Sequence, residues 1–280
     1  MNNTKFLAAI IFLIVTSSCG NETVTPAENI APGNDPNFTI TAHSDSGLTK
    51  ANRKVVVFGI DIYAAAQVED SKLLHAANVM AQYLDNDEDG TPDNQVVVDR
   101  MIAERAFLTM WKSESDLTEP PSGRQGQDLG NDETIPTYVT SGFTGRFDAS
   151  LEEVLHIITA AGYAKVYPDV FGERIGSEIA NAMDLARGGQ FTSIPSSYPA
   201  GSWYTYDDTT CEYDCMVTEY HYWALTSILG AQQNRLNEIG QEWQLNTREK
   251  VKNQDSAVFQ LMTDPQYSFA SVLPDGMYRR

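Results

Sequence analysis

Four aspartates fall within nine residues of this chain, and this segment strongly limits how the surrounding chain can fold. Residues 85–93 read DNDEDGTPD, with carboxylates at the first, third, fifth and ninth positions and a glycine at the sixth. Such carboxylates repel one another unless a cation lies between them, and glycine permits the tight bend that brings them together. Apolar side chains recur at helical spacing in residues 70–84, and residues 94–105 also look helical. The pattern predicts two helices joined by a cation-binding loop.

This acidic loop resembles an EF-hand or the short calcium loops of secreted proteins. The resemblance implies calcium, held by Asp85, Asp87, Asp89, Asp93 and the backbone carbonyl of Thr91. Val96 occupies the twelfth position, where an EF-hand has a bidentate glutamate, so binding is expected to be weak. Millimolar extracellular calcium still fills weak sites, and a cation between two helices is expected to be structural. The alternative is a solvated acidic turn.

The N-terminus is typical of an exported protein. Lys5 precedes the apolar residues 6–15, and small residues 16–18 lead to Cys19. A cysteine after small residues resembles the lipobox of bacterial lipoproteins, although Thr16 stands where leucine is usual. The resemblance implies acylation of Cys19 and a membrane-anchored protein of the periplasm or cell surface; an ordinary cleaved signal with secretion is the alternative. We expect residues 1–19 to be the signal, 20–50 a flexible tether, and 51–280 a single domain.

Composition narrows the possible partners and the fold class. The net charge of −19 disfavours nucleic-acid binding. Cys211 and Cys215, the cysteines after Cys19, are expected to form a disulfide in an oxidising compartment, with a thiolate metal site as the weaker alternative.

Strands are expected at 54–63, 106–111 and 137–143. Helices are expected at 148–163, 170–186, 216–236 and 247–261. The pattern predicts an α+β fold that is mostly helical, with a small N-terminal sheet.

A second motif lies in the predicted helix at 148–163. Glu152 and His156 are four residues apart and therefore share one helix face, with Glu153 beside them. The motif resembles the HExxH helix of zinc peptidases, with glutamate in place of the first histidine. The resemblance implies that Glu152 and His156 bind a metal and that Glu153 is the general base. The alternative is helix capping, because Ser150 and Glu153 have the spacing of a capping box.

A third ligand should come from a later helix, and Glu219 is the best candidate. The arrangement is similar to the gluzincins, including the branch that resembles anthrax lethal factor, over roughly residues 140–235. It implies a zincin-like fold and a metallopeptidase-like hydrolase acting on a peptide or protein substrate. His221 is a rival ligand, but it lies about 200° around the helix from Glu219. His75, on the helix before the acidic loop, is a further accessory candidate beside its simpler role as a buried core residue.

The exchange of histidine for glutamate changes the expected chemistry. Two glutamates and one histidine place a charge of −2 around a divalent ion, which acidifies a bound water less and weakens the preference for zinc over other divalent metals. Either the enzyme uses a modified centre, or it is a degraded zincin acting as a non-catalytic, calcium-binding protein of the cell surface. Carbohydrate processing by paired carboxylates is a third possibility. The aromatic residues of 198–222 either line a substrate cleft or pack under a long loop.

Overall fold

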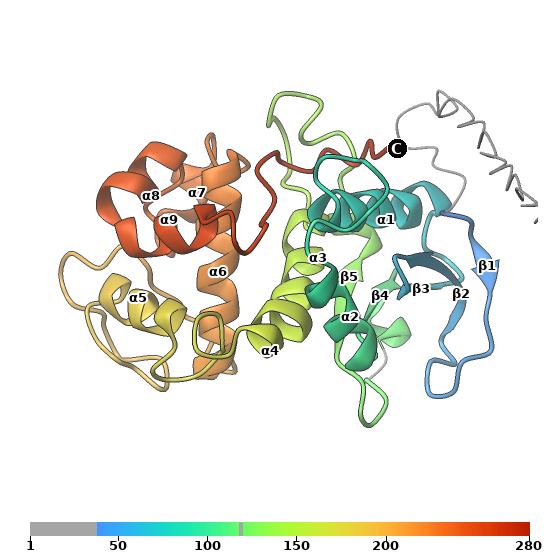
Figure 1. The fold of residues 1–280 in the computed structure, drawn as a ribbon, viewed down its shortest axis with the longest axis horizontal. Coiled ribbons are helices and arrows are strands. Elements are labelled where there is room, and N and C mark those ends of the chain that lie inside the picture. Colours follow the sequence, from blue (N-terminus) through green and yellow to red (C-terminus); the bar gives the residue numbers. More distant parts are fainter. Residues whose placement is uncertain (1–37, 118–119) are drawn as a thin grey trace, which may run out of the picture.

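The structure, a computed structural model, describes residues 38–117 and 120–280 (Figure 1). The expected signal, Cys19 and much of the expected tether lie outside these residues. The described chain combines helices with a five-stranded mixed sheet, as the predicted α+β class requires. Among the described residues, no helix is both long and apolar enough to cross a membrane.

The sheet has the strand order β1-β2-β3-β4-β5. The strands are β1 (Thr41–Ala42), β2 (Ala51–Val57), β3 (Ile60–Ala65), β4 (Phe107–Trp111) and β5 (Gly126–Gly130). The first three strands pair antiparallel, and β3, β4 and β5 pair in parallel. The single strand expected at 54–63 is instead a hairpin, because Phe58 and Gly59 adopt φ values of 47° and 86° and reverse the chain. The strand expected at 137–143 is a series of turns.

The folded part of the chain begins before residue 51, which corrects the expected tether boundary. β1 pairs with β2, and Leu48 is fully buried against Tyr63 and Phe107. Successive strand residues point to opposite faces of a sheet, so Tyr63 lies on the face opposite Ile62, which belongs to the main core. Residues 38–50 are therefore structured, and Leu48 helps to cover the second face of the sheet.

Helices take up more of the described chain than strands do (Figure 1). They are α1 (Asp70–Leu84), α2 (Gln95–Ala103), α3 (Ser150–Ile158), α4 (Ala164–Val166), α5 (Glu178–Ala186), α6 (Tyr213–Leu229), α7 (Leu236–Ile239), α8 (Arg248–Gln254) and α9 (Ser256–Thr263). Short 3₁₀ turns lie at η1 (Glu114–Asp116) and η2 (Asn131–Glu133), and η3 (Thr159–Tyr163) is a π-helical turn. The helix expected at 170–186 begins only at Glu178.

Helix α3 lies between the sheet and the C-terminal helices, and this position defines the candidate site (Figure 1). Its apolar residues Leu151, Val154 and Leu155 are buried, and the helix packs against α1, β5 and α6. The π-helical turn follows directly and brings Gly162 against α2, where an added Cβ would lie 2.7 Å from a methyl group of Val97. π-Helical turns inside helices are frequent at functional sites.

Candidate metal centre and calcium loop

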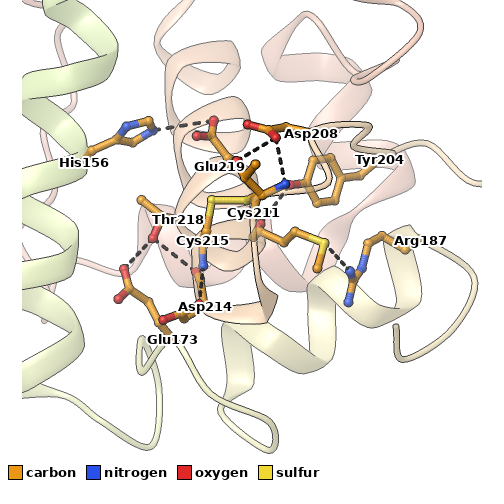
Figure 2. The surroundings of a disulfide bond; sticks show 12 residues. His156, Glu173, Arg187, Tyr204, Asp208, Cys211, Asp214, Cys215, Thr218 and Glu219 are labelled. Carbon is orange, nitrogen blue, oxygen red and sulfur yellow. Dashed lines mark hydrogen bonds and ion pairs between the residues drawn. A yellow bond between two sulfur atoms is a disulfide. The ribbon is translucent and has the colours of Figure 1, made fainter. Parts of the chain in front are cut away.

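Three of the expected ligands meet where α3 faces α6. Glu152, His156 and Glu219 each offer a ligand atom, and these atoms lie within 4.8 Å of one another. Figure 2 shows His156 reaching from α3 toward Glu219 on α6. The structure thus brings together the three side chains that the sequence indicates as metal ligands, although His156 and Glu219 are 63 residues apart in the chain.

The imidazole of His156 is the informative group of this cluster. Its Nε2 is buried and has no hydrogen-bond partner, although Oε2 of Glu219 lies 3.7 Å away. That distance exceeds the range of a hydrogen bond. Two ligands of one tetrahedral zinc ion, each bonded at about 2.0–2.2 Å, are about 3.4 Å apart. The separation therefore suits two ligands of a common ion better than a direct contact.

The electrostatics of the cluster also favour a cation. Burial lowers the pKa of His156, but the carboxylates of Glu219, Glu153 and Glu152 outweigh this effect and raise it to about 10. Burial, together with the charges of Glu153 and Glu219, raises the pKa of Glu152 to about 8. Burial likewise raises the pKa of Glu219. At neutral pH the protons held by Glu152 and His156 are therefore ones that a divalent ion can replace.

Glu153 occupies the other side of the imidazole. Its Oε2 lies 3.4 Å from Nδ1 of His156 and accepts a hydrogen bond from Nε2 of Gln127 on β5. A proton on Nδ1 that points to Glu153 leaves the lone pair of Nε2 free for a metal. Glu153 forms no capping box, since the hydroxyl of Ser150 donates to Asp148 instead. Sequence reasoning missed Gln127, because GQDLG carries no strand signal.

The accessory histidines lie outside the cluster. His221 packs against Phe171 and Phe269, with ring centroids 5.7 and 5.2 Å apart. Burial and the charge of His156 lower its pKa to about 3, so it is neutral. Nε2 of His75 lies 2.7 Å from Oδ2 of Asp148. The structure thus places His221 in an aromatic core and His75 in a buried pair.

The start of α6 is fixed by a disulfide between Cys211 and Cys215 (Figure 2). The bridge encloses the first turn of the helix, one turn before Glu219. Thr218, the residue before Glu219, donates a hydrogen bond to Glu173 at 2.6 Å. The helix then continues through a largely buried stretch to Gly230, whose φ of 95° ends it. These contacts set the position from which Glu219 approaches α3.

The acidic loop adopts the turn that its sequence predicts. Asp85, Asp87 and Asp89 have carboxylate oxygens within 4.8 Å of one another, and Gly90 has a φ of 91°. Asp93 lies beside this group, with its Oδ2 accepting from the backbone N–H of Asn86 at 2.8 Å.

Charge and burial act against this loop in the absence of a cation. Burial raises the pKa of Asp93, and the neighbouring charges of Asp87 and Asp89 raise it further. The backbone N–H of Thr91 donates to Asp89 at 2.8 Å. Val96, at the twelfth position, is 60% exposed and belongs to α2, so this position of the loop offers no side-chain ligand.

The C-terminal residues 271–280 pack across this loop. The hydroxyl of Tyr278 donates to the buried carboxylate of Asp85 at 2.5 Å, and the side chain of Gln82 accepts from the backbone of Gly276 at 2.8 Å. Gly276 has a φ of 75°, and an added Cβ would lie 2.1 Å from Nδ1 of His75. The tail therefore joins the loop to α1 and, through His75 and Asp148, to the start of α3.

Comparison with known protein families, characterised proteins and solved structures finds no match for this chain.

Proposed function

We propose that this chain is an exported, calcium-stabilised hydrolase with a zincin-like metal centre that acts on peptide bonds. Glu152, His156 and Glu219 would hold a divalent transition metal, zinc being the first candidate. The observation that carries the proposal is the buried Nε2 of His156, which has no hydrogen-bond partner and faces two carboxylates from different helices. A buried polar atom without a partner costs about 1–3 kcal/mol, which a bound ion would recover.

The remaining residues supply the acid–base and orienting groups of such a reaction. When bound, the metal would polarise the scissile carbonyl and acidify a water. Glu153 is the residue expected to act as the general base, and its side chain is 20% exposed. It would accept a proton from the attacking water and pass it to the leaving amine. Its contact with Nδ1 would also keep His156 in the ligating tautomer.

The neighbouring strand supports a peptide as the substrate class. β5 is the last strand of the described sheet, and its Gln127 contacts Glu153. An extended peptide can pair with the outer edge of such a strand through backbone hydrogen bonds. That placement would bring a peptide bond alongside α3. The proposal also includes a zincin-like relationship, a lipid anchor at Cys19 and an extracellular or periplasmic location.

A second candidate is a calcium-dependent surface-binding protein without catalysis. The contacts of Glu153 favour this candidate. Its carboxylate already interacts with Gln127 and His156, which makes it less available to accept a proton from a water. Here the acidic loop would be the functional metal site, and the centre on α3 a remnant.

Hydrolysis of a peptide library by the zinc-loaded chain separates these candidates. We expect cleavage by the wild type and its loss in Glu153→Gln, with zinc content and melting temperature retained. Glu249→Gln, a change on the exposed surface of α8, is the matched control and should leave cleavage unchanged. Equal turnover in wild type and Glu153→Gln would contradict the proposed mechanism. If no chain cleaves any peptide and calcium is the sole bound metal, the result would favour the binding protein.

A further inference from the structure

A pocket of about 340 Å³ lies apart from the three candidate metal ligands, none of which lines it. Its walls come from the segments 194–198, 205–207 and 241–242. Ile194, Pro195, Tyr198 and Tyr206 give it an apolar lining. This volume is at the lower end of the range for ligand pockets, which suits a single side chain better than a whole small molecule.

The three segments are held together by hydrogen bonds, so the pocket is preformed. The hydroxyl of Tyr198 donates to the backbone carbonyl of Tyr206 at 3.0 Å and accepts from its N–H at 3.2 Å. The N–H of Thr205 donates to the carbonyl of Glu242 at 2.8 Å, and the hydroxyl of Thr205 donates to the carbonyl of Gln241. An isolated bridge between Tyr204 and Trp243 extends this pairing.

Tyr206 connects the pocket with the metal centre. It lines the pocket, and its side chain makes a hydrogen bond with Glu219, one of the three candidate ligands. Glu219 in turn acts electrostatically on Glu242 at the pocket. Figure 2 shows Asp208, which follows the pocket segment 205–207 in the chain, beside Glu219. When a peptide is held at the metal centre, the side chain of the residue next to the cleaved bond would therefore lie within reach of the pocket.

The pocket has an unbalanced negative charge. Asp207 and Glu242 line it, and among the described residues no Lys, Arg or His does so. Two guanidinium groups act on its lining residues, Arg187 on Tyr198 and Arg235 on Glu242, and each already has a carboxylate partner. Arg187 bonds Asp184 at 2.7 Å. Arg235 bonds Glu238 at 2.6 Å. Burial and the charges of Asp207 and Glu219 raise the pKa of this half-buried Glu242 carboxyl, and the positive charge of Arg235 offsets the rise only in part.

We infer that this pocket selects a lysine or arginine side chain of the peptide substrate, next to the bond that is cleaved. The methylene stem would lie along Tyr198, Tyr206 and Ile194, and the charged head would pair with Glu242 and Asp207. Apolar walls alone would accept leucine equally well, so the two carboxylates carry the specificity. The inference rests on the proposed function for the position of the cleaved bond, but side-chain recognition by the pocket can be measured without hydrolysis.

Binding of matched peptides to the zinc-loaded Glu153→Gln chain tests the pocket directly. A set of hexapeptides carries lysine at each position in turn, and a second set carries norleucine, which has a similar stem without the charge. At one position we expect lysine to bind about tenfold more tightly than norleucine, the effect of one charge-assisted contact. Glu242→Gln should remove this difference and leave norleucine binding unchanged. Glu249→Gln removes the same charge outside the pocket and should preserve the preference.

The outcomes separate the pocket from the proposed activity. Equal binding of lysine and norleucine at every position, absence of binding by all peptides, or an equal loss in Glu249→Gln would overturn the inference. If the wild type hydrolyses no peptide while the lysine preference and its dependence on Glu242 persist, the proposed function fails and the pocket assignment stands. If the wild type cleaves peptides without a preference for a basic residue beside the cleaved bond, the pocket assignment fails alone.

Discussion

Binding of zinc at pH 7 should displace about two protons from the cluster on α3. The carboxylates around His156 raise its pKa to about 10, so the imidazole of the metal-free chain is protonated at this pH. Glu152, with a pKa raised to about 8, is protonated in about nine molecules of ten. Both groups must lose their protons before they can bind a metal.

The pH dependence of zinc affinity follows from the same values. Each displaced proton changes the apparent affinity about tenfold per pH unit. Affinity should therefore rise about a hundredfold per unit below pH 8, where both Glu152 and His156 are protonated. Between pH 8 and pH 10 only His156 retains its proton, and the slope should fall to about tenfold per unit.

Calorimetric titration in two buffers with different ionisation enthalpies counts the released protons. Glu152→Gln should lower the number from about two to about one, because His156 still loses its proton. Glu249→Gln should leave the number at about two. Zinc binding without proton release in the wild type, or an unchanged count in Glu152→Gln, would refute the electrostatic account of the cluster.

Three further predictions concern stability and the acidic loop. Gly276→Ala should lower the free energy of unfolding by about 3 kcal/mol, because the added Cβ at φ 75° would collide with His75. The control Gly201→Ala, at φ 92° with no atom within 4 Å of the added Cβ, should lower it by about 1 kcal/mol. Chemical denaturation measures both free energies, and equal losses would contradict the tail packing. Calcium at one hundred times its dissociation constant should stabilise the chain by about 2.7 kcal/mol, seen as a higher melting temperature that chelation reverses. Asp87→Asn should reduce this calcium shift without changing zinc content, and a full shift in that variant would exclude Asp87 as a ligand.

The sequence predicted local structure well where periodicity was strong. The apolar spacing of residues 70–84 gave the bounds of α1, and the i, i+4 spacing of Glu152 and His156 placed both on one face of α3. β5 was missed because two of its five residues are glycine and none is β-branched or aromatic. The pairing of that strand in the sheet comes from tertiary contacts that override local propensity.

Long-range contacts were less accessible from the sequence. Glu219 was placed at the centre only through the resemblance to gluzincins, since no local pattern connects it with His156. The packing of Tyr278 on Asp85 joins residues 193 apart, and no motif signals it. The aromatic side chains of segment 198–222 are divided between the core and a pocket wall. Tyr204 and Tyr220 are buried in the core, whereas Tyr198 and Tyr206 line a pocket.

Anomalous diffraction at the zinc edge, from crystals of the zinc-loaded chain, tests the central claim most directly. We expect one strong peak at about 2.0–2.2 Å from Nε2 of His156 and from carboxylate oxygens of Glu152 and Glu219. The same measurement on His156→Ala should show no peak there. Zinc bound solely at the acidic loop, or a wild-type peak that omits Glu219, would contradict the proposed centre.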